Sequence, residues 1–164
     1  MGPDLLPSEG ISNHGTPDAS LDVAGIADAC HRVVVEFAHR LDHREFDRAA
    51  ALFTPDGVWH RHGEDLVGTE QILETISARP PKLVERHVMT TIHVEVESAD
   101  HARATAYVLI VRGEGDASGP VEIPQPQALG EFHDRLRRTA HGWRIAERSS
   151  TPVFVLAKPG EERP

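Results

Sequence analysis

The chain has 164 residues, with 17 Lys+Arg against 26 Asp+Glu and a formal net charge of -9 at pH 7. This length fits one domain with its own core, and the acidic balance argues against binding to nucleic acids or anionic membranes. One cysteine, Cys30, excludes an internal disulfide and favours a reducing compartment. The first residues include Asp4 and Glu9 where a signal peptide needs basic residues, and no apolar run has the length of a membrane span. We therefore expect a cytoplasmic protein.

Residues 1–19 mix Gly, Pro, Ser, Asn and Asp without periodicity, which predicts a flexible leader. The folded domain is expected over 20–150. It begins with a long helix that runs through Leu41, with Ser20 or Asp22 available as the N-cap. The apolar stripe of this helix would consist of Ile26, Cys30, Val33, Val34 and Phe37.

A second, shorter helix is expected next, because Asp42 and Glu45 are spaced as in a capping box. Its buried face would consist of Phe46, Ala49, Ala50 and Phe53. The segment Thr54-Pro55-Asp56-Gly57 predicts a turn that ends the helix. A short strand over 58–62 and a third helix from Gly68-Thr69 to Pro80-Pro81 complete the helical half.

The second half of the chain predicts antiparallel strands. Alternating apolar residues mark two long strands over 92–96 and 102–110. A Gly- and Pro-rich loop over 113–130 precedes a hairpin of strands 131–138 and 143–150. Helices followed by such strands predict an α+β fold, a cone in which a curved, mainly antiparallel sheet wraps around three N-terminal helices.

Several short sequence motifs occur here in the same order as in a known protein family. They are Leu41-Asp42-His43-Arg44-Glu45-Phe46-Asp47, Leu52-Phe53-Thr54-Pro55-Asp56-Gly57-Val58-Trp59, Gly68, Arg86-His87, and Gly130-Glu131-Phe132-His133-Asp134-Arg135-Leu136 before Gly142-Trp143-Arg144. Over about residues 22–150 the chain resembles the SnoaL-like branch of the nuclear transport factor two-like superfamily, which includes scytalone dehydratase. The resemblance implies a cystatin-like α+β barrel with an interior cavity, and a homodimer that pairs through the sheet.

The resemblance implies that Asp42 and His87 are the catalytic residues. If both face the cavity, His87 can move a proton while Asp42 holds its tautomer or binds a water molecule. From the residues alone, Asp42 also fits an N-cap of the second helix and His87 a solvent-facing strand residue, so both alternatives stay open. The scytalone dehydratase tyrosine that precedes the aspartate is replaced by Leu41, which argues against phenol-assisted dehydration.

Strand alternation places Asp134 on the same face as Phe132, so we expect Asp134 to point inward and His133 to face solvent. An ion pair of Asp134 with Arg148 or Arg103 is the alternative. The residues expected to contact a substrate are Phe37, Trp59, Met89, Tyr107, Phe132 and Asp134.

A metal site is not expected. His60 and His62 share one face of a strand at a spacing that can bind a transition metal, but an acidic ligand at the usual spacing is missing. The sequence also contains no phosphate-binding glycine loop and no nucleophile elbow. We expect no cofactor.

These features predict a dehydratase-like lyase, isomerase or cyclase that acts on a small hydrophobic carbonyl compound, polyketide- or steroid-like. The alternative is a noncatalytic ligand-binding or structural subunit, such as the small subunit of an aromatic-ring dioxygenase. Residues 151–164 are expected to form a tail whose apolar start covers the cavity mouth or a dimer contact. The 113–130 loop is the other candidate for a lid.

Overall fold

The computed structural model describes residues 21–116, 119–123 and 128–155. Its helices are α1 (Val23–Asp42), α2 (Phe46–Ala50) and α3 (Gly68–Ser77), and its strands are β1 (Phe53–Arg61), β2 (Glu64–Val67), β3 (Leu83–Val96), β4 (His101–Glu114), β5 (Ala128–Thr139) and β6 (Gly142–Val155). The predicted leader and the end of the predicted tail lie outside the described residues, as does part of the 113–130 loop.

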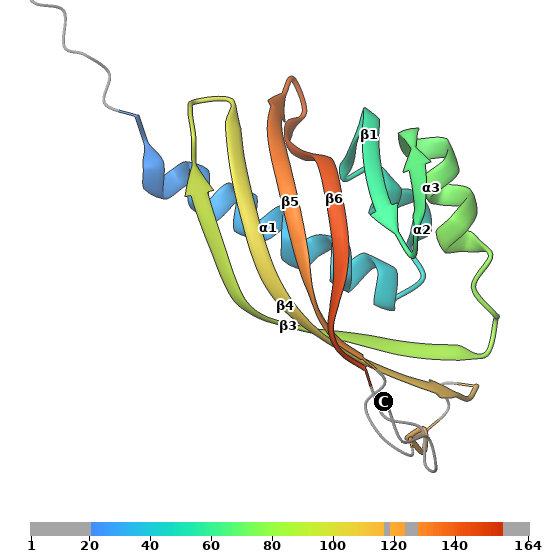
Figure 1. Ribbon diagram of the computed structural model, residues 1–164. Helices are drawn as coiled ribbons and strands as arrows, with labels where there is room; N and C mark the ends of the chain where they lie inside the picture. Colours follow the sequence, from blue (N-terminus) through green and yellow to red (C-terminus); the bar gives the residue numbers. More distant parts are fainter. Residues whose placement is uncertain (1–20, 117–118, 124–127, 156–164) are drawn as a thin grey trace, which may run out of the picture.

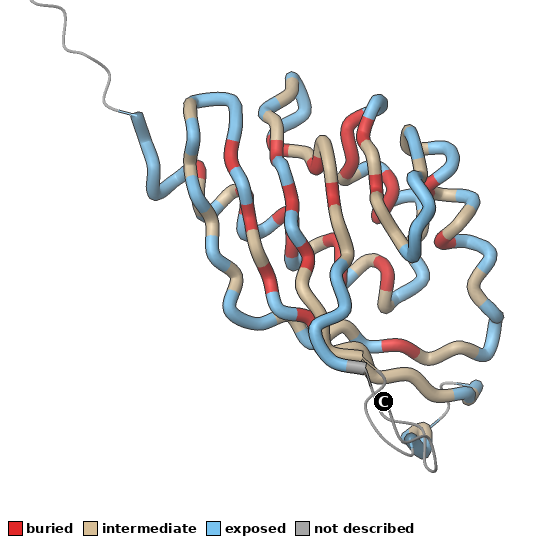
Figure 2. The backbone as a smooth tube through the Cα atoms, in the orientation of Figure 1, coloured by how far each residue is buried: buried red, intermediate tan, exposed pale blue. Residues whose placement is uncertain are grey.

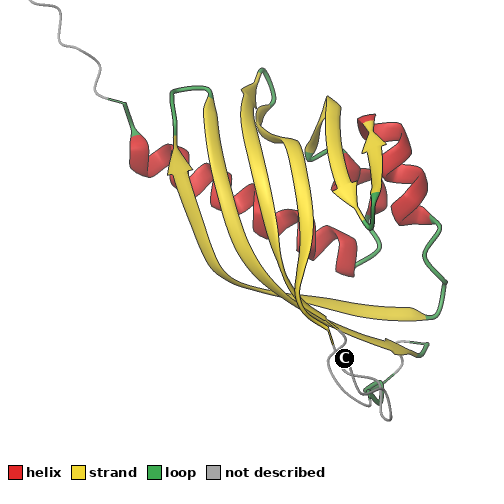
Figure 3. Ribbon diagram, in the orientation of Figure 1, coloured by secondary structure: helices red, strands yellow, loops and turns green. Residues whose placement is uncertain are grey.

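The described strands form one curved sheet in the order β2-β1-β6-β5-β4-β3, and α1 lies across its concave face (Figure 1). Neighbouring strands are antiparallel except β1 and β6, which are parallel. The view coloured by secondary structure shows the helices gathered on one side of the sheet (Figure 3). The predicted α+β fold with a curved, mainly antiparallel sheet is confirmed. None of the described helices combines the length and the hydropathy of a membrane span.

The core lies between α1 and the inner face of the sheet (Figure 2). Helix α1 begins after Asp22, whose side chain accepts a hydrogen bond from the backbone N–H of Gly25 at 2.9 Å, as expected of an N-cap. The buried face of α1 consists of Ile26, Cys30, Val33, Val34, Phe37, Ala38 and Leu41. The inner face of β4 carries Ala102, Ala104 and Ala106, small side chains that let the helix approach the sheet.

Cys30 lies within this core and is fully buried. Burial raises the pKa of its thiol to about 11. The thiol is therefore protonated at neutral pH and is not a candidate nucleophile.

The predicted end of the second helix is wrong. Helix α2 stops at Ala50, and Phe53 already begins β1. The segment expected to be a turn, residues 54–57, lies within β1, where the register with β6 shifts between Phe53 and Val58. Gly57 allows this close approach, because a Cβ there would lie 2.9 Å from the backbone oxygen of Thr54. Residues 54–57, which were predicted to form a turn, therefore form an irregularity inside strand β1.

Candidate active site

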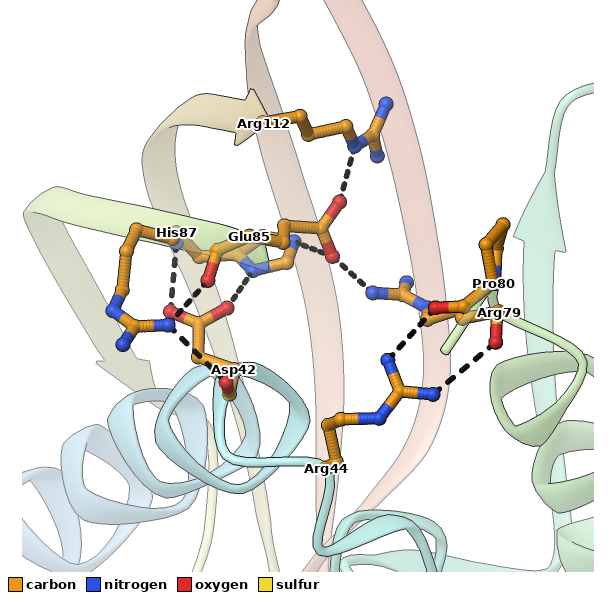
Figure 4. Close-up of polar contacts among 8 residues, drawn as sticks. Asp42, Arg44, Arg79, Pro80, Glu85, His87 and Arg112 are labelled. Carbon is orange, nitrogen blue, oxygen red and sulfur yellow. Dashed lines mark hydrogen bonds and ion pairs between the residues drawn. The ribbon is translucent and has the colours of Figure 1, made fainter. Parts of the chain in front are cut away.

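Asp42, the last residue of α1, contacts His87 of β3 (Figure 4). Its Oδ1 lies 2.6 Å from Nδ1 of His87, and its Oδ2 accepts a hydrogen bond from the backbone N–H of His87 at 2.8 Å. The side chain of His87 is 3% exposed and that of Asp42 is 7% exposed. A carboxylate at Nδ1 favours the tautomer with the proton on Nδ1, which leaves Nε2 as the atom that can accept a proton.

This contact decides between the alternatives that the sequence left open. Asp42 does not cap α2, whose N-cap residue is Glu45 and lacks a side-chain hydrogen bond to the helix. His87 does not face solvent. The reason is strand parity, which turns Glu85, His87 and Met89 toward the inside while Arg86 and Val88 are exposed.

Arg86 fastens the end of α1 to β3. Its Nη1 donates hydrogen bonds to the backbone oxygen of Asp42 at 3.2 Å and to that of Glu85 at 2.7 Å. On the other side, Arg44 donates hydrogen bonds to the backbone oxygens of Arg79 and Pro80 in the segment between α3 and β3 (Figure 4). These hydrogen bonds from arginine side chains to backbone oxygens therefore fix the positions of α1, β3 and the α3–β3 segment, which bear Asp42, His87 and Arg79, relative to one another.

Glu85 is a site residue that the sequence analysis missed. Its side chain is 5% exposed, and its two carboxylate oxygens contact Arg79 and Arg112. Burial alone raises the pKa of Glu85, but the guanidinium groups of Arg79 and Arg112, which contact its carboxylate, outweigh burial and hold this pKa below its usual value. Glu85 is therefore an ionised carboxylate, and its Oε1 lies 3.8 Å from Nε2 of His87, beyond hydrogen-bond distance.

Asp42, Glu85 and His87 place ligand atoms within 4.8 Å of one another, a spacing that could hold a metal ion. Each oxygen of Glu85 already accepts from a guanidinium group, and two positive charges beside the trio oppose a divalent cation. The arrangement is an ion-pair network.

His60 and His62 have other roles. His60 lies 2.6 Å from a carboxylate oxygen of Asp65 and 3.2 Å from one of Glu147. His62 and Gly63 both have positive φ, 53° and 84°, and form the two-residue turn between β1 and β2.

A partly open cavity of about 100 Å³ adjoins His87. Its apolar wall includes Trp59, Val108, Ile110 and Phe132. The indole Nε1–H of Trp59 donates to the hydroxyl of Ser150 at 2.9 Å, which fixes the plane of the ring. Typical ligand sites measure roughly 300–1,000 Å³, so this cavity has room for only one end of a drug-sized molecule.

The residues predicted to contact a substrate fall into three groups. Trp59 and Phe132 line the cavity. Phe37 is fully buried behind Trp59, with the two rings edge to face and their centroids 5.5 Å apart, and Met89 packs against the core. Neither of these two is among the cavity-lining residues. The prediction for Tyr107 is wrong: this residue is 43% exposed on the outer face, because Ala106 and Val108 are the inward residues of β4.

Asp134 points inward as expected and also forms the alternative ion pair. Both its oxygens accept hydrogen bonds from Arg148 at 2.6 Å, and both side chains are at most 1% exposed. The Arg148 guanidinium lies over the rings of Phe37 and Phe132, 4.3 and 4.5 Å from their centroids. This pair lies beside the cavity wall, not in the lining itself, and therefore supports the core. His133 is exposed on the outer face, as predicted.

Comparison with known proteins agrees with this architecture. A SnoaL-like domain model matches residues 21–149, and no curated protein matches the chain. ActVI-ORFA from Streptomyces coelicolor superposes with a TM-score of 0.66 at 23% identity, over 80% of this chain and 99% of that one.

Two structures from Novosphingobium aromaticivorans are also similar. One is an NTF2-like protein with a cystatin-like fold, with a TM-score of 0.70 at 19% identity, over 88% of this chain and 92% of that one. The other is a candidate scytalone dehydratase, with a TM-score of 0.66 at 16% identity, over 83% of this chain and 94% of that one. At these identities the likeness shows the fold alone, and the predicted cystatin-like fold is confirmed.

Proposed function

The chain belongs to the SnoaL-like family, and we propose that it is a lyase, isomerase or cyclase in which Asp42 and His87 move a proton next to a carbonyl group. The observation that carries this proposal is the buried 2.6 Å contact of Asp42 with His87 beside a cavity that has an apolar wall. The substrate we propose is a small hydrophobic carbonyl compound. The exposed Val88 and Tyr107 on the outer face of β3 and β4 support the homodimer expected through the sheet.

The chemistry begins with His87 as the base. Its Nε2 takes the proton from the carbon next to C=O, the C–H electron pair forms a C=C bond, and the carbonyl π pair moves to oxygen to give an enolate. The Asp42 carboxylate stabilises the imidazolium that results, and arginines on the cavity wall supply positive charge near the enolate oxygen.

The imidazolium then returns its proton. Delivery to a β-hydroxyl group releases water and completes a dehydration, whereas delivery to another carbon completes an isomerisation. If the enolate carbon attacks a second carbonyl group, the proton goes to the new alkoxide and a ring closes. A phenol cannot assist in the cavity, because the single tyrosine of the chain, Tyr107, lies on the outer face.

The first test follows the exchange of α-protons of 2-tetralone in D₂O by proton NMR. We expect the protein to accelerate exchange over buffer, and Asp42→Asn to lower the rate at least about tenfold, because the amide no longer stabilises the imidazolium. Asp47→Asn, at an exposed position on α2, is the matched control and should leave the rate unchanged. Exchange by the wild-type protein that does not exceed buffer would favour the noncatalytic alternative.

A further inference from the structure

The cavity has more positive charge than its proton-transfer pair requires. Arg61, Arg79 and Arg112 all contribute to its lining. Two carboxylates lie near these three cations. Glu85 contacts Arg79 and Arg112, and Asp42 contacts His87. Glu64 lies opposite Arg61 in the β1–β2 pairing and acts on it electrostatically, but forms no ion pair with it.

Glu131 does not restore the balance. It contributes to the lining, but its carboxylate lies 3.1 Å from Nε2 of His133. His133 is exposed on the outer face of β5, and alternation turns Phe132 inward and its neighbours outward. The charge of Glu131 is therefore directed away from the cavity.

Arg61 is the cation without an acidic partner. It ends β1 half-buried, with its guanidinium 5.2 Å from the ring centroid of Trp59, and no carboxylate of the described residues forms an ion pair with it. Burial, and then the positive charges of Arg79 and Arg112, lower the pKa of Arg61 and outweigh the negative charges of Glu85 and Glu64, which act in the opposite direction. An anion beside Arg61 would relieve both effects.

We propose that the substrate is a carbonyl compound with a planar apolar part and a carboxylate group, and that Arg61 binds this carboxylate. This proposal rests on the proposed function and specifies its substrate class. The planar part would lie against Trp59 and Phe132, within reach of His87. A guanidinium group matches a carboxylate with two parallel hydrogen bonds, which fixes orientation as well as charge. Arg61 would thus determine which end of the substrate enters the cavity.

The test compares the binding of trans-cinnamate and trans-cinnamamide, which share shape and differ in charge. Ligand-observed NMR titrations at 0.15 M salt give the two dissociation constants without any turnover. We expect cinnamate to bind about tenfold more tightly than cinnamamide, and Arg61→Met to remove this preference. Arg61→Lys keeps the charge but loses the paired hydrogen bonds, and should retain part of the preference.

Two controls keep the result decisive. Arg103→Met, at an exposed arginine of β4 that pairs with Glu97, should leave both dissociation constants unchanged. His87→Gln should keep the preference for cinnamate while losing proton exchange, so that a failure of catalysis is distinguished from a failure of anion binding. Equal affinities for the two probes, no binding of either, or an undiminished preference in a folded Arg61→Met variant would overturn the proposal.

Discussion

Replacing His87 with alanine is expected to lower the protein-catalysed exchange of 2-tetralone α-protons by about 10²- to 10⁴-fold, the usual contribution of a positioned general base. The reason is that His87 lines the cavity and that Asp42 holds its Nδ1 at 2.6 Å, which leaves Nε2 as the nitrogen that can accept a proton. Glu85 cannot replace the lost base, because its two oxygens already contact Arg79 and Arg112. Proton NMR in D₂O gives the rates of both proteins under the same conditions.

The matched control is His93→Ala. His93 lies on the same strand as His87, and its side chain is 71% exposed. Its removal should leave the exchange rate unchanged, and circular dichroism shows whether each variant keeps the fold. An exchange rate in folded His87→Ala equal to that of the wild type would contradict the assignment of His87 as the base.

Replacing Asp134 with alanine is expected to reduce the free energy of unfolding by about 3–5 kcal/mol. Arg148 would then remain fully buried without a counter-charge, since both hydrogen bonds to Asp134 would be lost. Urea unfolding followed by tryptophan fluorescence measures this loss. The effect should be much larger than that of any exposed ion pair on the outer face.

A second substitution separates buried charge from lost packing. The double variant Asp134→Ala with Arg148→Met removes both charges and should recover a large part of the lost stability. Asp56→Ala, which removes an exposed partner of Arg137, should change stability little. If Asp134→Ala unfolded at the same urea concentration as the wild type, the buried pair would have no structural importance.

The fold was predictable because its signals are periodic. The apolar stripe of α1, with Cys30 and Phe37 in it, and the alternation along β4 follow directly from residue spacing. The N-cap of α2 was not predictable, because the capping-box spacing of Asp42 and Glu45 competed with a contact between residues 45 positions apart. Asp42 is bound by His87, and no local rule reports such a partner.

The site was predictable only in part. Strand parity alone places Glu85 on the face of His87, so this acid was within reach of the sequence analysis. Alternation along β4 likewise places Tyr107 on the outer face, because Ala106 and Val108 point inward, and the prediction for Tyr107 did not follow this alternation. Arg79 and Arg112 both contact Glu85 because the α3–β3 segment and the curvature of the sheet bring them to the same place. Residue spacing in the sequence does not specify this arrangement.

We infer that Asp42 holds the neutral His87 ring with its proton on Nδ1, so that Nε2 is free to accept a proton. The most direct test is a nitrogen-15 NMR spectrum of histidine-labelled protein, in which the His87 signals are assigned by their loss in His87→Ala. We predict that the neutral ring carries its proton on Nδ1, and that Asp42→Asn weakens this preference. A neutral His87 that carries its proton on Nε2 would contradict the claim, because that nitrogen could not then accept a proton from a substrate.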